Sequence, residues 1–357
     1  MHAAPVVVAL RHHLPGIQVD ALGGPALARA GATIRHATAS HAVMGLVEVL
    51  TSLPRHLALL RHLDQEFRGR KYDLLLAIDY PGFNLRLAER ATRNGVPVVY
   101  YIPPKHWATS SRLTPRFARA VSRVACILPF EPEYFRSYGI RAEFVGHPLL
   151  DREPAPSRDP ARRALGIGPA ERVVALFPGS RRQEIDQMWP AFRDTGKRLL
   201  AAHTVDRVLV ATLAGRSYPE PGDASLVGDQ PALVWASADA ALVKSGTATL
   251  EGALASVPMV VAYRMNRFTG WVARRMIRVP WISLVNLIAK RAIVPELLQD
   301  DVNPEALHLA VAPLLERHSP AAARQLAGFR EIQSMLGERG AAERVAGMCR
   351  ELLASRS

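Results

Sequence analysis

Short, continuously apolar runs alternate with segments of helical periodicity along almost the whole chain, and this alternation constrains the fold more than any other feature. Helical periodicity is clear at residues 84–92, 183–201 and 249–255. The apolar runs, which we expect to be strands, cover residues 18–22, 74–78, 96–102, 124–128, 142–145, 173–177, 207–212, 240–243 and 258–262. Strands of this kind are typical of parallel sheets covered by helices on both faces. We therefore predict an α/β protein with two Rossmann-like, doubly wound domains.

Residues 147–169 (HPLLDREPAPSRDPARRALGIGP) interrupt the alternation with several prolines and mixed charges, which is the composition of a linker. We expect an N-terminal α/β domain over residues 1–152 and a C-terminal α/β domain over residues 153–357, helical from Pro304 onward. Two such domains facing a cleft would bind a ligand at the carboxyl ends of the strands of both.

The formal net charge of +13 favours an anionic partner, which could be a nucleic acid, an acidic membrane or a phosphorylated substrate. No acidic residue lies between Gly252 and Pro295, where basic side chains are interleaved with Trp and aliphatic residues. This mixture is typical of an interfacial membrane segment, with a solvated helix face as the alternative. A nucleic-acid partner is not expected, because no stacking platform or known binding module accompanies the charge.

Two stripes of side chains also bear on the surface. Four arginines at helical spacing predict one basic stripe on a helix, either holding an acidic headgroup or facing solvent; they are Arg112, Arg116, Arg119 and Arg123. An apolar stripe is expected in the core, with an exposed patch where Pro54 breaks the helix as the alternative; it contains Leu46, Val49, Leu50, Leu53, Leu57 and Leu60. As the membrane or lipid surface we select Arg112, Arg116, Trp271, Arg274, Arg275 and Trp281.

Asp79 is the candidate catalytic residue. It follows an apolar strand directly, in the stretch LLLAIDYPGFN (74–84), and parallel sheets place ligand contacts at such strand ends. A carboxylate there could take a proton from an attacking hydroxyl as a general base. The alternative is that Asp79 caps a helix beginning near Asn84, with Pro81 and Gly82 forming the turn.

Two strand-to-helix turns predict an anion site. In VVALFPGSRRQEIDQM (173–188), Gly179 allows close approach to the backbone, Ser180 can cap a helix, and Arg181 can pair with phosphate oxygens. In LVKSGTATLEGAL (242–254), small residues again meet the start of a helix, at Ser245, Gly246 and Thr247. Both turns could converge on one diphosphate and neutralise it as a leaving group without a metal.

We predict no metal site and no cofactor. The chain has no strand-end DxD pair, and its two cysteines, Cys126 and Cys349, lie far apart, which also argues for a reducing compartment. His12 and His13 are adjacent, so we do not expect them to chelate a metal from one helix face.

With these motifs in order, the chain resembles the lipid-A-disaccharide synthase family from near residue 1 to about residue 315. Any one motif alone is a weak signal, but their order is specific. They are AVMGLVEVL (42–50), IDYPGFNLRLA (78–88), LPFEPEYFRSYGI (128–140), FVGHPLLD (144–151), LFPGSRRQEI (176–185), SGTATLEGAL (245–254), PMVVAYRM (258–265), SLVNLIAKR (283–291) and VPELLQ (294–299).

The resemblance implies a GT-B fold and an inverting, metal-independent transfer of 2,3-diacylglucosamine from UDP to the 6-hydroxyl of 2,3-diacylglucosamine 1-phosphate. By motif, Asp79 matches the family's essential acidic position and Arg181 its essential arginine. Further matches to the polar positions of the donor side are Glu251, Arg264, Asn286, Glu296 and Gln299. The family works at the cytoplasmic face of the inner membrane, so an anionic membrane surface is an expected partner, and a homodimer is one option for the assembly.

The chain departs from the family pattern at several positions. Pro103 and Thr109 replace usual residues of the motif YYIPPKHWAT (100–109), Lys290 and Ala292 replace a Gly and an acidic residue, and residues 213–234 form a shorter region than is typical. Two alternatives therefore stay open: a catalytically inactive, membrane-associated homologue that binds sugar nucleotides, and an enzyme with another lipid or sugar nucleotide as substrate.

The family's Gly-rich first loop, of Gly-Glu-x-Ser-Gly-Asp type, has no counterpart, because Met1 falls where that loop should end. Residues 4–13 read as a helix, and a domain of this kind should open with a strand that feeds this helix. We expect Met1 to be an internal methionine, with about 10–20 upstream residues encoding the strand and loop of the doubly wound domain. A natural truncation is the alternative.

Overall fold

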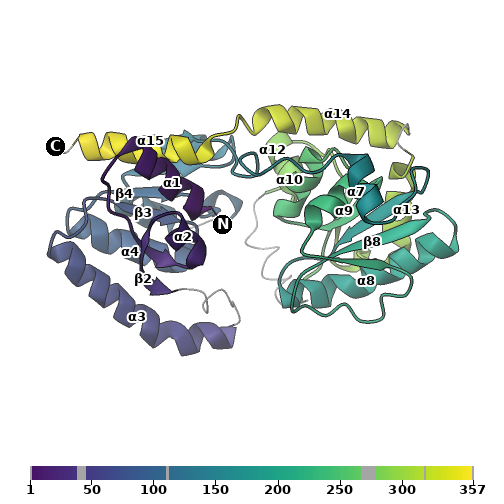
Figure 1. Ribbon diagram of the computed structural model, residues 1–357, viewed down its shortest axis with the longest axis horizontal. Helices are drawn as coiled ribbons and strands as arrows, with labels where there is room; N and C mark the ends of the chain where they lie inside the picture. Colours follow the sequence, from purple (N-terminus) through teal and green to yellow (C-terminus); the bar gives the residue numbers. More distant parts are fainter. Residues whose placement is uncertain (1, 38–45, 110–111, 267–278, 317–318, 356–357) are drawn as a thin grey trace. The chain divides into compact units, whose positions relative to one another are not determined.

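The computed structural model describes residues 2–37, 46–109, 112–266, 279–316 and 319–355 (Figure 1). The chain divides into two compact units. Unit 1 contains Met1–Arg152 and Leu336–Ser357, and unit 2 contains Glu153–Met335. Within the described ranges, no helix has both the length and the apolar character needed to cross a bilayer.

Unit 1 contains two parallel sheets. The smaller sheet pairs β1 (Asp20–Gly23) with β2 (Thr33–Ala37). The larger sheet has the order β3-β4-β5-β6, with strands at Leu75–Ile78, Val98–Tyr101, Arg123–Cys126 and Ala142–Phe144. The interior strand β4 is almost completely buried, as a parallel strand between two helical layers should be.

Helices cover both faces of the larger sheet (Figure 1). One apolar core lies against α3, α4, α5 and α6, which span Leu46–Arg68, Pro81–Arg93, Thr114–Ala120 and Glu131–Arg136. The other core joins the sheet to α1 (Ala3–His13) and α15 (Ala341–Ala354) through residues such as Val6, Leu10 and Val345. The short helix α2 (Pro25–Arg29) connects β1 to β2, and the 3-10 helix η1 (His106–Ala108) follows β4.

Unit 2 is built on one parallel sheet of order β12-β11-β10-β7-β8-β9. In chain order, β7 to β12 cover Val173–Phe177, Arg207–Thr212, Ser225–Gly228, Ala240–Lys244, Met259–Tyr263 and Glu296–Leu298. Helices α8 (Arg182–Ala201) and α13 (Pro304–Val311) pack on one face through a core that includes Trp189 and Phe192. The remaining helices are α7 (Arg158–Ala164), α9 (Pro231–Ser237), α10 (Thr247–Leu254), α12 (Leu284–Ala289) and α14 (Pro320–Met335).

The expected α/β class and each of the expected strands are confirmed, most to within two residues at either end. Three strands were not predicted: β2, β9 and β12. Each lies at the outer edge of its sheet and mixes polar with apolar residues, as in TIRHA for β2 and SLVG for β9. An edge strand is covered on fewer sides than an interior one, so it lacks the continuous apolar run on which the prediction relied.

The end of the chain does not belong to the domain to which we assigned it. The prediction placed residues 153–357 together, but Leu336–Ser357 forms part of unit 1. The reason is the amphipathic helix α15, whose apolar face, including Met348 and Cys349, packs against α1 and the larger sheet. Both cysteines are free and buried.

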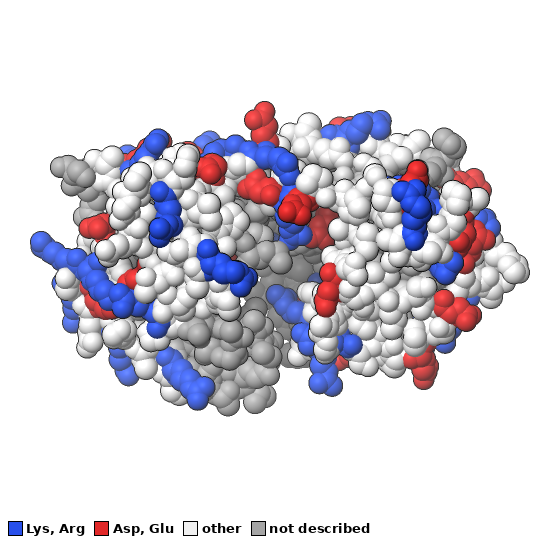
Figure 2. Space-filling model, viewed as in Figure 1, with Lys and Arg blue, Asp and Glu red and all other residues white. Residues whose placement is uncertain are grey.

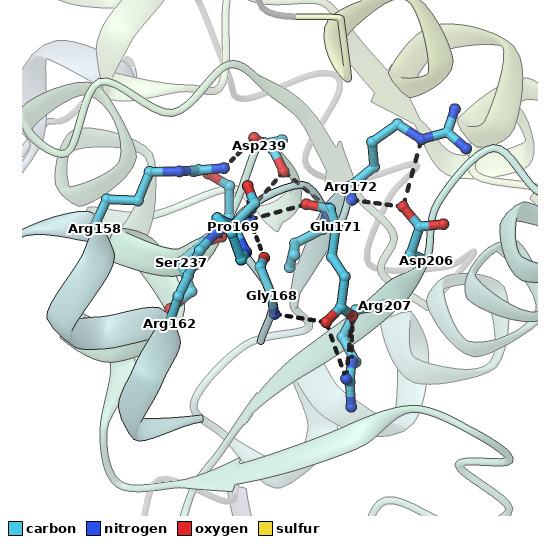
Figure 3. A network of polar contacts seen from close by, with 12 residues as sticks. Arg158, Arg162, Gly168, Pro169, Glu171, Arg172, Asp206, Arg207, Ser237 and Asp239 are labelled. Atoms are coloured by element: carbon cyan, nitrogen blue, oxygen red, sulfur yellow. Dashed lines mark hydrogen bonds and ion pairs between the residues drawn. The ribbon is translucent and has the colours of Figure 1, made fainter. Parts of the chain in front are cut away.

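A buried cluster of charges fastens α7 to the sheet of unit 2 (Figure 3). The carboxylate of Asp239 accepts hydrogen bonds from Arg158 (2.6 Å), Arg162 (2.8 Å) and the backbone N–H of Val173 (2.9 Å). Arg162 also donates to the carbonyl groups of Gly168, Pro169, Glu171 and Ser237. Val173 begins β7, so the cluster lies at the amino edge of the sheet, away from the edge where parallel sheets bind ligands. We assign it a structural role.

Candidate functional site

The strand order of unit 2 points to one place for a ligand. From β7 the chain proceeds through β8 to β9 on one side, and then returns to β10 on the other side of β7. Ligands of doubly wound sheets bind outside the carboxyl ends of the two strands where the order reverses, here β7 and β10. The two turns selected from the sequence follow these two strands.

The turn after β7 brings the chain close to Glu184. Gly179 has φ of 125°, and a Cβ at this position would lie 2.8 Å from the Cβ of Glu184, so only glycine fits without rearrangement. The Glu184 carboxylate accepts from the backbone N–H groups of Ser180 (3.1 Å) and Arg181 (3.3 Å). It therefore occupies N–H groups that a helix start offers to an anion.

Lys244, the last residue of β10, joins the two turns. Its ammonium donates to the carboxylate of Glu184 at 2.9 Å and lies 5.1 Å from the ring centroid of Tyr263, at the end of β11. Burial, the largest influence, acts to raise the pKa of Glu184, but the hydrogen bond and charge of Lys244 contribute to a net lowering of that pKa. Glu184 and Lys244 were not selected from the sequence, although both lie inside the quoted motifs.

Arg181 caps α8, and its side chain is largely exposed. Its guanidinium contacts Glu184 at 3.4 Å, and 66% of its side chain is exposed. With Lys244 it places two positive charges beside one negative charge at this edge of the sheet. A diphosphate that displaced the Glu184 carboxylate from the N–H groups would meet both cations.

The turn after β10 uses part of its polar chemistry internally. Ser245 donates its hydroxyl to the carbonyl of Ile282 (2.7 Å), and Thr249 donates to that of Gly246 (2.8 Å). The Thr247 side chain, at the first position of α10, is exposed, and Glu251 is half-buried one turn further on. The first N–H groups of α10 have no side-chain cap.

Four of the residues selected for the donor side brace the adjoining loops. Arg264 donates to the carbonyl groups of Gln299 (3.1 Å) and Val302 (2.6 Å), and the Gln299 side chain accepts from the N–H of Met265. Glu296 accepts from the N–H groups of Ile282 and Ser283 and from the Ser283 hydroxyl, as well as from the side-chain amide of Asn286.

Asn286 is completely buried, and its amide makes four hydrogen bonds within the protein. Its position therefore favours a role in holding the loop that ends in β12, rather than direct contact with a ligand. Trp281, selected for the membrane surface, is half-buried immediately before this loop.

Asp79 in unit 1 has an unusual backbone. Asp79 and Tyr80 both have left-handed conformations, with φ of 50° and 47°. Two such residues in succession store strain, which proteins retain mostly at functional sites. The carbonyl of Asp79 accepts from the buried Tyr100 hydroxyl (2.7 Å) and from Asn84 (2.7 Å), and its N–H donates to Tyr101 (2.9 Å).

These bonds fix the backbone and leave the carboxylate exposed, with no hydrogen bond or ion pair to any described residue. The alternative role as a helix cap is wrong, because α4 begins at Pro81 and Tyr80 occupies the capping position. Pro81 and Gly82 belong to the first turn of α4 rather than to a separate loop.

Buried titratable groups that the sequence did not single out lie near the same edge of unit 1. Glu131 accepts from the indole N–H of Trp107 (3.0 Å) and from the backbone N–H groups of Ile127 and Leu128, and burial raises its pKa to about 7. Burial lowers the pKa of His147 to about 4. Glu131 lies in the motif LPFEPEYFRSYGI and His147 in the motif FVGHPLLD, so both were within stretches selected from the sequence. Residue type alone does not reveal that their side chains are buried.

The predicted basic stripe is not on one helix, so that prediction is wrong. Arg112 precedes α5, Arg116 and Arg119 lie on it, and the helix ends at Ala120. Arg123 belongs to β5, where its side chain pairs with Glu351 (2.6 Å). Instead, α4 and α5 together line a groove of about 800 Å³ with five arginines and one glutamate: Arg86, Arg90, Arg93, Arg116, Arg119 and Glu89.

Charged side chains of both signs are spread over the face drawn in Figure 2. Trp271, Arg274 and Arg275 lie outside the described residues. In the apolar stripe, Leu60 is buried and Leu57 is half-buried, which agrees with a core position for these two residues; the side chains of Leu46, Val49, Leu50 and Leu53 lie outside the described part of the chain. Pro54 does not break this helix, because α3 continues through it to Arg68. A proline removes only one hydrogen bond, and the later part of α3 packs through Leu63 and Phe67.

One set of side chains in the described part of the chain has the spacing for a metal. The ligand atoms of His12, His13 and Glu343 lie within 4.8 Å of one another, and His13 contacts Glu343 at 2.7 Å. The third member of the set, Glu343, comes from α15, and the expectation that the two adjacent histidines do not chelate a metal from one helix face stays a prediction. The set is largely exposed, and Arg350 lies 3.5 Å from His13, which disfavours a cation.

Comparisons with known proteins give a consistent result. A family described as lipid-A-disaccharide synthetase matches residues 1–344. The lipid-A-disaccharide synthase of Anaeromyxobacter dehalogenans (strain 2CP-C) is 40% identical over 355 residues, which cover 97% of this chain and 92% of the relative. That of Myxococcus xanthus (strain DK1622) is 39% identical over 366 residues, which cover 99% of this chain and 94% of the relative.

Solved structures share the fold at low sequence identity. A Staphylococcus aureus MnaA–UDP structure has a TM-score of 0.65 at 14% identity and covers 99% of this chain and 93% of that one. The UGT89C1 of Arabidopsis thaliana in complex with UDP has a TM-score of 0.58 at 15% identity, and the match covers 99% of this chain and 92% of that one. The fold is the GT-B fold, with two Rossmann-like domains.

Proposed function

Because this chain belongs to the lipid-A-disaccharide synthase family, we propose a division of roles between its two units: unit 2 binds the UDP-linked sugar, and Asp79 of unit 1 activates the acceptor. The chain is a glycosyltransferase of lipid A disaccharide formation. In the proposed reaction, 2,3-diacylglucosamine is transferred from UDP to the 6-hydroxyl of 2,3-diacylglucosamine 1-phosphate.

The acceptor step depends on the free carboxylate of Asp79, and this observation carries the proposal. As the acceptor oxygen attacks the anomeric carbon, its proton passes to Asp79, which acts as general base. The strained backbone at Asp79 and Tyr80, held by Tyr100 and Asn84, fixes the point from which the carboxylate projects, and the carboxylate is not used as a helix cap.

The donor step depends on the two turns of unit 2. The bond between the anomeric carbon and the phosphate oxygen breaks as the new glycosidic bond forms, so negative charge grows on the departing UDP. Arg181, Lys244 and the N–H groups of Ser180 and Arg181 would stabilise that charge once the diphosphate has displaced the Glu184 carboxylate that now accepts from them. We assign Ser245, Gly246 and Thr247 to the other side of the same diphosphate, and Glu296, Asn286, Arg264 and Gln299 to the loops behind it.

We also propose that unit 1 contacts the anionic inner face of the inner membrane. The arginine-lined groove of α4 and α5 supports this, because five guanidinium groups with one carboxylate attract acidic headgroups. The acylated substrates reside in such a membrane. The selection of Trp271, Arg274, Arg275 and Trp281 for the same surface stays a prediction.

The reaction itself tests the function. The purified protein is incubated with UDP-2,3-diacylglucosamine and 2,3-diacylglucosamine 1-phosphate, and UDP and the disaccharide 1-phosphate are measured by mass spectrometry. Equal amounts of both products are expected. Release of UDP without disaccharide would show a hydrolase, and the absence of both products would contradict the proposed reaction.

A further inference from the structure

His147 is a buried histidine with one ring nitrogen that has no partner. It follows β6 in the larger sheet of unit 1, and only 3% of the residue is exposed. Its Nδ1 accepts from the backbone N–H of Leu149 at 3.2 Å, so the single proton of a neutral imidazole is on Nε2. Within the described part of the chain this Nε2–H donates to no acceptor, and the atom is not enclosed. Buried donors are normally paired, so this one is available to a ligand.

The surroundings of His147 favour an anion as that ligand. Burial is the main reason that the pKa of His147 falls to about 4, and the positive charges of His2, Arg152 and Lys105 act in the same direction. The imidazole is therefore neutral near pH 7 and keeps its Nε2–H as a donor. Positive charges that disfavour an imidazolium favour an anion at the same place.

The loop that begins with His147 is held in place by the start of α15. Gly146 has φ of 83°, and a Cβ at this position would lie 2.9 Å from the carbonyl oxygen of Glu338, so the turn requires glycine. Asp151 is the one acidic residue of the sequence 145–152, and its carboxylate accepts from the N–H groups of Gly340 (2.6 Å) and Ala342 (3.4 Å). The acidic group of this loop is thus engaged with α15.

His147 and Asp79 lie at the same edge of one sheet. Each follows the carboxyl end of a parallel strand, β6 and β3, with β5 and β4 in between. Neighbouring strands are about 4.8 Å apart, so the ends of β3 and β6 are about 14 Å apart. Lys105 belongs to the loop after β4 and so follows a strand that lies between these two.

We propose that His147, together with Lys105 and Arg152, binds the phosphate group of the acceptor, with the Nε2–H of His147 donating to a phosphate oxygen. This inference rests on the proposed function, in which Asp79 takes the proton of the 6-hydroxyl. The 6-hydroxyl and the 1-phosphate project from different ends of the sugar. One acceptor molecule, hydrogen-bonded at both ends, would therefore bridge the sheet edge from Asp79 to His147. Holding the phosphate would orient the hydroxyl toward its base.

Two substitutions separate the two nitrogens of His147. Asn has an acceptor oxygen close to the position of Nδ1 and nothing at the position of Nε2, whereas Gln can place an N–H donor close to Nε2 and has no acceptor at Nδ1. His147→Asn should therefore keep the bond to Leu149 and lose the phosphate contact. His147→Gln should weaken the loop and keep the phosphate contact.

The test measures the Kd for N-acetylglucosamine 1-phosphate and for N-acetylglucosamine by NMR titration of the full chain. The unsubstituted protein should bind the phosphate at least about 100-fold more tightly, because several charge-assisted bonds contribute. His147→Asn should raise the Kd for the phosphate by about tenfold or more, and His147→Gln should raise it much less. Lys105→Gln should also raise it. Arg141→Gln, exposed at the amino end of β6, is the control and should not.

Equal affinity of the unsubstituted protein for the two sugars would overturn the proposal, and so would an unchanged Kd in His147→Asn. Equal losses in His147→Asn and His147→Gln would also overturn it, because His147 would then only hold the loop. If His147→Asn does not fold, Lys105→Gln against Arg141→Gln decides, and equal effects of these two overturn the proposal. The binding measurement needs no glycosyl transfer, so its failure is distinguishable from failure of the proposed function.

Discussion

Replacing Arg181 with Ala should separate UDP binding from stability. The guanidinium has one contact within the described chain, to Glu184 at 3.4 Å, and 66% of the side chain is exposed. An exposed pair of this kind contributes less than about 1 kcal/mol, so the free energy of unfolding should change little. A charge-assisted bond to a diphosphate is worth about 1.5–3 kcal/mol, so the Kd for UDP should rise by about 10- to 150-fold.

The matched control is Arg182→Ala. Arg182 is the next residue, carries the same charge, is 84% exposed and pairs weakly with Asp186 at 3.7 Å. Isothermal titration calorimetry with UDP and urea unfolding are measured for both variants. Unchanged UDP affinity in Arg181→Ala would refute the assignment of the site. Equal losses in the two variants would show that overall charge, rather than the position of Arg181, attracts the nucleotide.

Three further predictions concern unit 1 and the loops of unit 2. The pKa of Glu131 is about 7 in the folded protein and 4.5 ordinarily, so the folded state binds more protons and the free energy of unfolding falls as pH rises between these values. In urea titrations, the free energy of unfolding of the unsubstituted protein minus that of Glu131→Gln should be larger at pH 5 than at pH 7.5 by roughly 1–3 kcal/mol. A difference that does not depend on pH would contradict this. Asn286→Ala should lower the free energy of unfolding by about 2–4 kcal/mol, because the part-buried N–H of Ile293 and the buried N–H of Val294 lose their acceptor, and a change below about 1 kcal/mol would contradict its bracing role. Arg119→Glu should weaken sedimentation with anionic vesicles by about tenfold at low salt, whereas Arg330→Glu on α14 should not; equal effects would remove the groove from the membrane surface.

The sequence predicted the interior strands and the turns after β7 and β10, because both signals are local. A continuous apolar run marks a buried strand, and small residues after it mark a helix start. It did not predict that Glu184 would occupy the N–H groups of its own turn, or that Lys244 would reach it from another strand. Such pairings depend on which strands become neighbours, and Glu184 and Lys244 are 60 residues apart in the sequence.

Residue type was a poor guide to whether a polar side chain faces a ligand. Arg264 and Asn286 were predicted to line the donor side from the resemblance, yet their side chains hold backbone groups of the neighbouring loops. The amphipathic pattern of α15 likewise shows that one face is buried, but not that this face packs in unit 1. Periodicity identifies a buried face and leaves its partner undetermined.

The most direct test of the central claim is the turnover and donor affinity of Asp79→Asn, measured together. The substitution should leave the Kd for UDP unchanged and lower kcat by about 10²–10⁴-fold, since a positioned base contributes about that much. Asp73→Asn, at the amino end of the same strand, is the control and should retain normal kcat. Near-normal kcat in Asp79→Asn would contradict the account, because the acceptor proton would then have another destination.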